Sequence, residues 1–268
     1  MLASRFMPFR AALSPTVNEE RPSPLLMWLE ARATMEMASL PLALPALLRY
    51  VPRGDGHPVL VLPGLLADDA STAPLRQFLS GRGYAVQGWG QGRNLGPREG
   101  VVAQMREMLA QMHASEQRKV SIIGWSLGGV FARELARHAP ESVRQVITLG
   151  SPRYDDLETN SNAEEVHKLG SGRTRGDDGV RGDGAPPVPT TSIYTRMDGV
   201  VGWGCSVERQ SATTDNIEIN SATHTGLGVN PLVWYALGDR LAQPEDQWAQ
   251  FAPKGFAKLL FPFTAPQR

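Results

Sequence analysis

The sequence predicts an α/β domain in which a mainly parallel sheet carries helices on both faces. Short continuous apolar runs, typical of strands buried on both sides, alternate with longer amphipathic segments from residue 57 onward. This alternation indicates βαβ units. The length of 268 residues and the 41% hydrophobic content are sufficient for one large domain with a buried core.

The individual elements follow from these patterns in order. A helix is expected at residues 70–81 because Asp68 and Asp69 offer caps before it and a glycine ends it. The expected strands are residues 59–62, 84–89, 119–124, 143–149, 191–196 and 216–220, and the expected helices are residues 70–81, 100–115, 127–138 and 231–242. Right-handed crossovers bring the carboxyl ends of parallel strands to one edge, where ligands bind in such folds.

Two segments fall outside this rhythm. Residues 25–48 are apolar but are interrupted by Glu30, Arg32 and Glu36, with Pro41 and Pro45 breaking the second half. This favours an amphipathic helix over a membrane span or a signal peptide. We expect residues 1–56 to be a helical extension packed on the core of one α/β domain at residues 57–268, or alternatively to offer residues 25–48 for a membrane-surface or dimer contact.

The second segment, residues 155–190, precedes a strand and is dense in glycine, arginine, aspartate and proline around residues 161–189. This composition predicts a flexible surface insert, and its place near the carboxyl edge makes a lid the alternative.

Composition excludes several classes of function. Lysine plus arginine (27) equals aspartate plus glutamate (27), and no basic stripe with interleaved aromatics occurs, so nucleic-acid binding is not expected. Cys205 is the only cysteine, which rules out an internal disulfide and fits a reducing, cytoplasmic location. No cysteine and histidine cluster has metal-ligand spacing, so no metal site is predicted.

The strongest motif is Gly-Trp-Ser-Leu-Gly at residues 124–128, followed by a further glycine. A buried strand leads into it and an amphipathic helix leaves it, which is the context of a sharp turn that exposes a nucleophilic serine hydroxyl. Ser126 is therefore the predicted nucleophile. A serine at neutral pH needs a base, and the base needs an orienting acid.

Asp198 and His224 are the predicted acid and base. Each follows a predicted strand, and their chain order after the serine is the one used in this type of fold. Asp155 and Asp156 remain alternative acids, and Asp239 is interpreted as a solvated helix residue. The other histidines are interpreted as surface or packing residues: His57, His113, His138 and His167.

An oxyanion intermediate needs two donors. The amide of Leu127, directly after the nucleophile, is one. The other is expected in the turn after the first strand, at Leu65 with Leu66 as the alternative, because Pro63 has no N–H. Arg93 and Asn94, in a glycine-rich loop, are predicted to border the site or to brace a loop.

With these residues the chain resembles the α/β-hydrolase superfamily, and within it bacterial lipase- and esterase-like proteins. The motifs are LPG at residues 62–64, GWSLGG at 124–129, TRMDGVV at 195–201 and HTGLGVNP at 224–231. The resemblance implies an acyl-enzyme mechanism without metal or organic cofactor, in which Ser126 attacks, His224 takes its proton and Asp198 holds the imidazole. One departure is Pro63-Gly64, where many relatives have His-Gly.

The residues around the predicted site are apolar and suggest a pocket for an acyl chain. The predicted pocket residues are Leu66, Trp125, Val200, Val201 and Leu227. The hypothesis is a carboxylesterase for short to medium acyl chains, with lipase activity if the N-terminal segment or the insert gates the pocket. The alternatives are an acyltransferase with the same triad and a non-catalytic, hydrolase-like binding protein.

Overall fold

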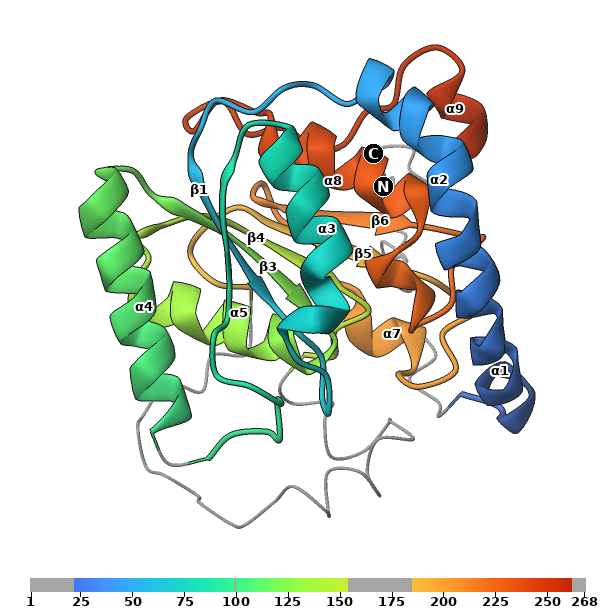
Figure 1. Cartoon of the computed structure of the whole chain (residues 1–268), viewed down its shortest axis with the longest axis horizontal. Helices are drawn as coiled ribbons and strands as arrows, with labels where there is room; N and C mark the ends of the chain where they lie inside the picture. The colour runs from blue at the N-terminus through green and yellow to red at the C-terminus, as the bar shows by residue number, and fades with distance from the viewer. Residues whose placement is uncertain (1–21, 99, 154–184, 262–268) are drawn as a thin grey trace, which may run out of the picture.

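A parallel sheet forms the centre of the molecule (Figure 1). The computed structural model describes residues 22–98, 100–153 and 185–261. Within them the sheet has six strands in the order β2-β1-β3-β4-β5-β6, and every neighbouring pair is parallel. The strands are β1 (Pro58–Leu62), β2 (Ala85–Gly88), β3 (Val120–Trp125), β4 (Val143–Leu149), β5 (Thr190–Tyr194) and β6 (Thr214–Glu218). The predicted parallel sheet is thus confirmed.

Helices cover both faces of this sheet because side chains alternate along each strand. In β1, Val59 and Val61 join the core under α2, α3 and α8, whereas Leu60 and Leu62 join the core under α4 and α5. The helices are α1 (Pro24–Leu29), η1 (Glu30–Arg32), α2 (Ala33–Tyr50), α3 (Asp69–Gly81), α4 (Val101–Glu116), α5 (Leu127–His138), α7 (Trp203–Ser206), η3 (Gly226–Gly228), α8 (Pro231–Leu241) and α9 (Ala257–Leu260).

The last strand lies two residues earlier than predicted, since β6 covers Thr214–Glu218 and not residues 216–220. Its first residues are polar, so the strand does not begin with an apolar run, and the prediction from apolar runs began too late. Asp215 within it is held by the Phe251 amide, which donates to its carboxylate at 2.5 Å. Pairing with β5 and this hydrogen bond together accommodate a carboxylate in the strand.

The N-terminal helix α2 continues through Pro41 and Pro45, so the expected break in its second half is wrong. Both prolines lie on the exposed side of the helix, where their rings meet solvent. The opposite side packs Leu40 and Leu47 into the core, and α2 contacts α8. Burial of this stripe offsets the hydrogen bonds that the prolines cannot make.

Some predictions fall outside the described residues. These are residues 1–21 of the N-terminal extension, the greater part of the insert at 155–190, the alternative acids Asp155 and Asp156, and His167. Across the residues that are described, no helix combines the length and the apolar character needed to cross a membrane.

Candidate active site

Ser126 lies in a strained turn between β3 and α5. Its φ is 52° and its ψ is −122°, values that L residues rarely adopt, and its amide donates to the Leu149 carbonyl at 2.8 Å. The flanking glycines are needed because a Cβ at Gly124 would overlap the Gly128 carbonyl, and one at Gly128 would overlap the Leu62 carbonyl. The strain and the glycines together present the hydroxyl at the carboxyl edge of the sheet.

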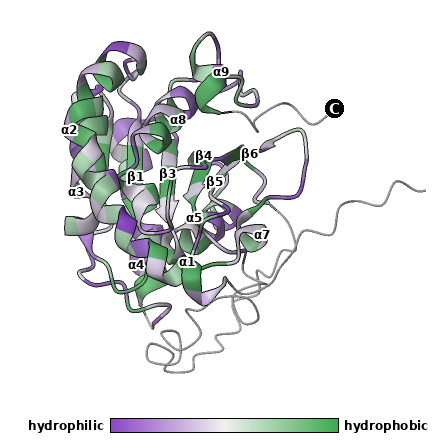
Figure 2. Cartoon of the chain, turned by 90° about the vertical axis from the view of Figure 1, so that its right-hand side faces the viewer, coloured by the Kyte–Doolittle hydropathy of each residue, from purple (hydrophilic) through white to green (hydrophobic). Residues whose placement is uncertain are grey.

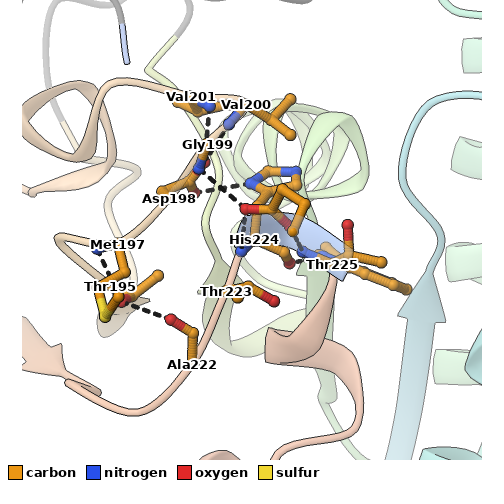
Figure 3. A network of polar contacts seen from close by, with 12 residues as sticks. Thr195, Met197, Asp198, Gly199, Val200, Val201, Ala222, Thr223, His224 and Thr225 are labelled. Atoms are coloured by element: carbon orange, nitrogen blue, oxygen red, sulfur yellow. Dashed lines mark hydrogen bonds and ion pairs between the residues drawn. The ribbon is translucent and has the colours of Figure 1, made fainter. Parts of the chain in front are cut away.

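Asp198 and His224 are in direct contact (Figure 3), each on a loop that follows a strand. Nδ1 of His224 lies 2.7 Å from Oδ2 of Asp198, and the two residues are 6% and 2% exposed. Oδ1 of Asp198 accepts hydrogen bonds from the amides of Val200 (2.9 Å) and Val201 (2.7 Å). With the proton on Nδ1 directed at the carboxylate, Nε2 of the neutral imidazole keeps its lone pair.

The serine turn and the histidine loop are joined through their neighbours. Nε1 of Trp125 donates to the His224 carbonyl at 3.1 Å. Gly150, which follows β4, is so close that an added Cβ would lie 3.1 Å from both Asp198 Oδ2 and His224 Nδ1. Although both residues are described, no hydrogen bond joins the Ser126 hydroxyl to His224. Catalytic hydrogen bonds are often formed only when substrate is bound.

The turn after β1 packs directly on the serine turn. A Cβ at Gly64 would lie 3.2 Å from Cβ of Ser126. The Leu66 amide donates to the Asn94 carbonyl at 2.7 Å, whereas the Leu65 amide has no hydrogen bond within the described residues. Of the two candidate donors for an oxyanion, only Leu65 has its N–H unoccupied.

Asn94 braces this turn and is fully buried. Its Nδ2 donates to the Pro63 carbonyl at 2.9 Å, and its own amide donates to the Ala67 carbonyl at 2.8 Å. Of the two roles considered for Asn94, the structure therefore favours bracing.

Known proteins resemble this chain in sequence and in structure. Residues 58–170, less than half of the chain, match the family model described as palmitoyl protein thioesterase. This stretch contains Ser126 but ends before Asp198 and His224. The crystal structure of Aspergillus fumigatus lipase B has a TM-score of 0.52 and 20% identity, covering 71% of this chain and 54% of that one. The chain belongs to the α/β-hydrolase superfamily.

Further superfamily members show the extent of the match. The α/β-hydrolase domain-containing protein 10 from mouse superposes with a TM-score of 0.51 at 16% identity, over 70% of this chain and 90% of that one. Pimeloyl-(acyl-carrier protein) methyl ester esterase of Aliivibrio salmonicida is 34% identical over 113 residues, 40% of this chain and 41% of the relative. Serine hydrolase BPHL of Homo sapiens is 31% identical over 40% of each chain. The matched part spans about two fifths of the length of these curated relatives.

The predicted pocket residues differ in exposure. Leu227 is fully buried and belongs to the hydrophobic core, and Val201 is also buried. Their side chains are therefore not open to a ligand in this structure. Trp125 and Val200 are half-buried and Leu66 is 50% exposed, so these three side chains are accessible to a ligand.

Two of the competing histidines, His57 and His113, and the competing carboxylate of Asp239 have other partners. His57, at the opposite edge of the sheet, lies between Asp55 and Ser121, and His113 contacts the Ser142 hydroxyl at 2.8 Å. Asp239 pairs with the adjacent Arg240 at 2.6 Å. The described residues include no group of three histidine, cysteine or acidic side chains placed to hold a metal ion.

The pKa of His224 is raised above its usual 6.5. Burial alone would lower this pKa, but the Asp198 carboxylate outweighs burial through its charge and its hydrogen bond, and the charge of Glu30 adds to the effect. The imidazole is therefore a stronger base than an exposed histidine.

Sequence reasoning missed Glu30 and Glu36, which it treated only as interruptions of an apolar stretch. Glu30 accepts hydrogen bonds from the amides of His224 and Thr225, and Glu36 accepts from the amide of Thr223. The available signal was that two carboxylates in an otherwise apolar helix need partners if they face the core.

Proposed function

We propose that this protein is a serine hydrolase that cleaves carboxylic esters or thioesters through an acyl-enzyme. The observation that carries the proposal is the strained Ser126 turn at the same sheet edge as the buried Asp198–His224 pair. The names of the relatives, a methyl ester esterase and a thioesterase family, point to the same bond types.

The proposed reaction uses the side chains of Ser126, His224 and Asp198 and two backbone amides. Oγ of Ser126 attacks the acyl carbon as Nε2 of His224 takes the hydroxyl proton. The amides of Leu65 and Leu127 donate to the oxyanion. His224 then gives its proton to the leaving alcohol or thiol, and finally activates water, which releases the acid. Asp198 keeps the imidazole oriented and stabilises its positive charge.

The acyl group is proposed to be apolar. Leu66 in the turn after β1, Trp125 in the serine turn and Val200 beside Asp198 are accessible apolar side chains, and none of them carries a charge that would attract a polar acid. We expect short to medium acyl chains as substrates. Each additional methylene contributes about 0.8 kcal/mol to binding only if it is buried against apolar protein surface.

The test is hydrolysis of a nitrophenyl ester series from acetate to palmitate, with acyl thioesters of the same chain lengths, together with labelling by a fluorophosphonate. We expect labelling that disappears in Ser126→Ala and a turnover number about a million-fold lower in that variant. Added alcohols during the assay reveal acyl transfer as an ester product. Absence of labelling and negligible rates for the whole series would exclude the proposed reaction. Labelling without turnover would favour a non-catalytic binding protein.

The outward side of α1 and α2 forms an apolar surface. The exposed large hydrophobic residues on it are Leu25, Met27, Trp28, Met35, Met37, Leu42, Leu44, Leu48 and Tyr50. Much of α2 is coloured as hydrophobic in Figure 2. Glu30 in η1 and Glu36 in α2 both accept hydrogen bonds from the histidine loop, so Arg49 is the charged residue on the exposed side of α2.

We propose that this surface binds an anionic lipid surface, because an apolar helix face with a basic and no acidic side chain complements negatively charged headgroups. Flotation with phosphatidylcholine vesicles, with and without phosphatidylserine, tests this. Binding should require phosphatidylserine and be lost in Trp28→Ser/Leu42→Ser, whereas Phe256→Ser on α9 should retain it. Concentration-dependent dimers without flotation would show instead that the surface binds a second copy.

A further inference from the structure

The loop that carries His224 is held by carboxylates from the far end of the sequence. The amides of Thr223, His224 and Thr225 are consecutive, and each donates to a glutamate. Thr223 bonds Oε1 of Glu36 at 2.9 Å, His224 bonds Oε1 of Glu30 at 2.9 Å, and Thr225 bonds Oε2 of Glu30 at 2.8 Å. Hydrogen bonds from amides to a carboxylate are stronger than those to a neutral acceptor.

Glu30 also bridges two loops. Its Oε1 accepts from the amide of Gly199 at 2.9 Å as well as from that of His224. Gly199 directly follows Asp198, so a single carboxylate oxygen ties the residue after the acid to the base itself, as the dashed contacts in Figure 3 show for the surrounding network. Glu30 therefore links the backbone of the Asp198 loop to the backbone of the His224 loop.

Glu36 holds the other end of the loop. It is 8% exposed, its Oε1 accepts from the Thr223 hydroxyl at 2.9 Å, and its Oε2 accepts from Nδ2 of Asn230 at 2.8 Å. Asn230 in turn caps α8 through its Oδ1, which accepts from the Leu232 amide at 2.9 Å. The loop is thus fixed from the residue before His224 to the first turn of the next helix.

The N-terminal segment and the two catalytic loops approach so closely that two loop positions have no room for a side chain. A Cβ at Gly226 would overlap the carboxylate of Glu36, and one at Gly199 would overlap the Leu26 carbonyl. Both loops carry glycine where the N-terminal helices approach most closely.

We propose that Glu30 and Glu36 are positioning residues of the active site, so that η1 and α2 of the N-terminal segment act in catalysis by holding His224 on Asp198. This rests on the proposed function. Glu30 has a second effect, since its negative charge favours the protonated imidazole. The charged groups around His224 are Asp198 after β5, Glu30 and Arg32 in η1, where Arg32 contacts the Met197 sulfur at 3.7 Å, and Glu36 in α2.

The first test compares Glu30→Gln, which keeps the shape and loses the charge, with Glu107→Gln, a control on the exposed side of α4 that touches neither loop. In Glu30→Gln the pKa of His224 should fall, because one favourable negative charge is gone. The acid limb of kcat/KM should then move to lower pH, and kcat should fall about ten- to a hundred-fold with KM little changed, as expected for a misplaced base. Glu107→Gln should match the wild type in all three measurements.

Glu30→Asp distinguishes the effect of the charge from that of the side-chain length. The shorter side chain keeps the negative charge but cannot span Gly199, His224 and Thr225 together, so kcat should fall while the acid limb stays closer to the wild type. Glu36→Gln should lower kcat because its amide group cannot accept from Asn230. Thermal unfolding of each variant shows whether the loss is one of stability.

Titration of the His224 imidazole by NMR, assigned with His224→Gln, needs no substrate and no turnover. It therefore reports on Glu30 even if fluorophosphonate labelling were to exclude the hydrolase function. An unchanged titration together with an unchanged kcat in Glu30→Gln would overturn the positioning role.

Discussion

Asp198 divides its carboxylate between two tasks, because one oxygen holds its own loop and the other holds His224. An amide in its place presents an N–H₂ group to one of these partners. If that group faces the imidazole, Nδ1 must become the acceptor and Nε2 carries the proton, so the base is lost.

Asp198→Asn should therefore lower kcat by about ten-thousand-fold while the fold persists. Asp239→Asn, on the surface of α8, is the matched control and should leave kcat unchanged. Steady-state kinetics with circular dichroism measures both. A large loss in Asp155→Asn or Asp156→Asn, with activity retained in Asp198→Asn, would instead assign the acid to one of those residues.

A carboxylate, an imidazole and a hydroxyl also meet at the opposite edge of the sheet, without access to a substrate. Nδ1 of His57 lies 2.5 Å from Asp55 and Nε2 lies 2.9 Å from the Ser121 hydroxyl, and both His57 and Ser121 are fully buried. Residue types alone thus do not define a catalytic site. A strained turn and an open edge distinguish Ser126 from Ser121.

His57 should make stability depend on pH. Burial and the nearby charge of Arg144 lower its pKa to about 4, although Asp55 opposes the shift. Between pH 6.5 and 4 the unfolded chain binds a proton at His57 that the folded chain excludes, so stability falls as the pH decreases through this window. The shift corresponds to about 3 kcal/mol.

Urea unfolding at a series of pH values tests this. The free energy of unfolding of His57→Gln should depend less on pH between 6.5 and 4 than that of the wild type, whereas Ser126→Ala should keep the wild-type dependence. Identical slopes in His57→Gln and the wild type would contradict the assignment.

At the scale of elements, the contact of α2 with the histidine loop depends on the absence of a side chain at Gly226. Gly226→Ala forces the Glu36 carboxylate away, which should cost about 1–3 kcal/mol of stability and lower kcat more than the stability loss explains. Gly81→Ala is the control, because an added Cβ there has no atom within 4 Å. Thermal unfolding and steady-state kinetics of the two variants test this prediction. A wild-type kcat in Gly226→Ala would show that catalysis tolerates displacement of the Glu36 carboxylate.

At the scale of the molecule, a buried ion pair joins α5 to the segment before β6. Nε of Arg133 lies 2.6 Å from Oε1 of Glu208, and both side chains are 2% exposed. The Arg133 guanidinium also donates to the Ser151 hydroxyl at 2.9 Å, next to the site. The pair therefore connects α5, which follows the serine turn, to the segments after β4 and before β6.

Arg133→Met leaves Glu208 buried without its partner and should cost about 3–5 kcal/mol, measured by urea unfolding. Adding Glu208→Met should recover most of this loss, because no buried charge remains. The exposed pair Lys119–Glu245, 3.0 Å apart, is the comparison, and Lys119→Met should cost less than about 1 kcal/mol. A double variant as unstable as Arg133→Met would argue against the charge as the cause.

The parallel sheet, the helices on both faces and the superfamily could be predicted from local signals, which are the apolar runs, the glycines that flank Ser126 and the turn residues. Residues 57–268 as a separate domain and a cytoplasmic location stay predictions. The pairing of Asp198 with His224 was predicted from chain order and is seen as a contact. Tertiary structure decided that Leu66 has its amide occupied, that Leu227 belongs to the core, and that Glu30 and Glu36 hold the histidine loop. These depend on contacts between residues up to 195 positions apart, which leave no periodic pattern in the chain.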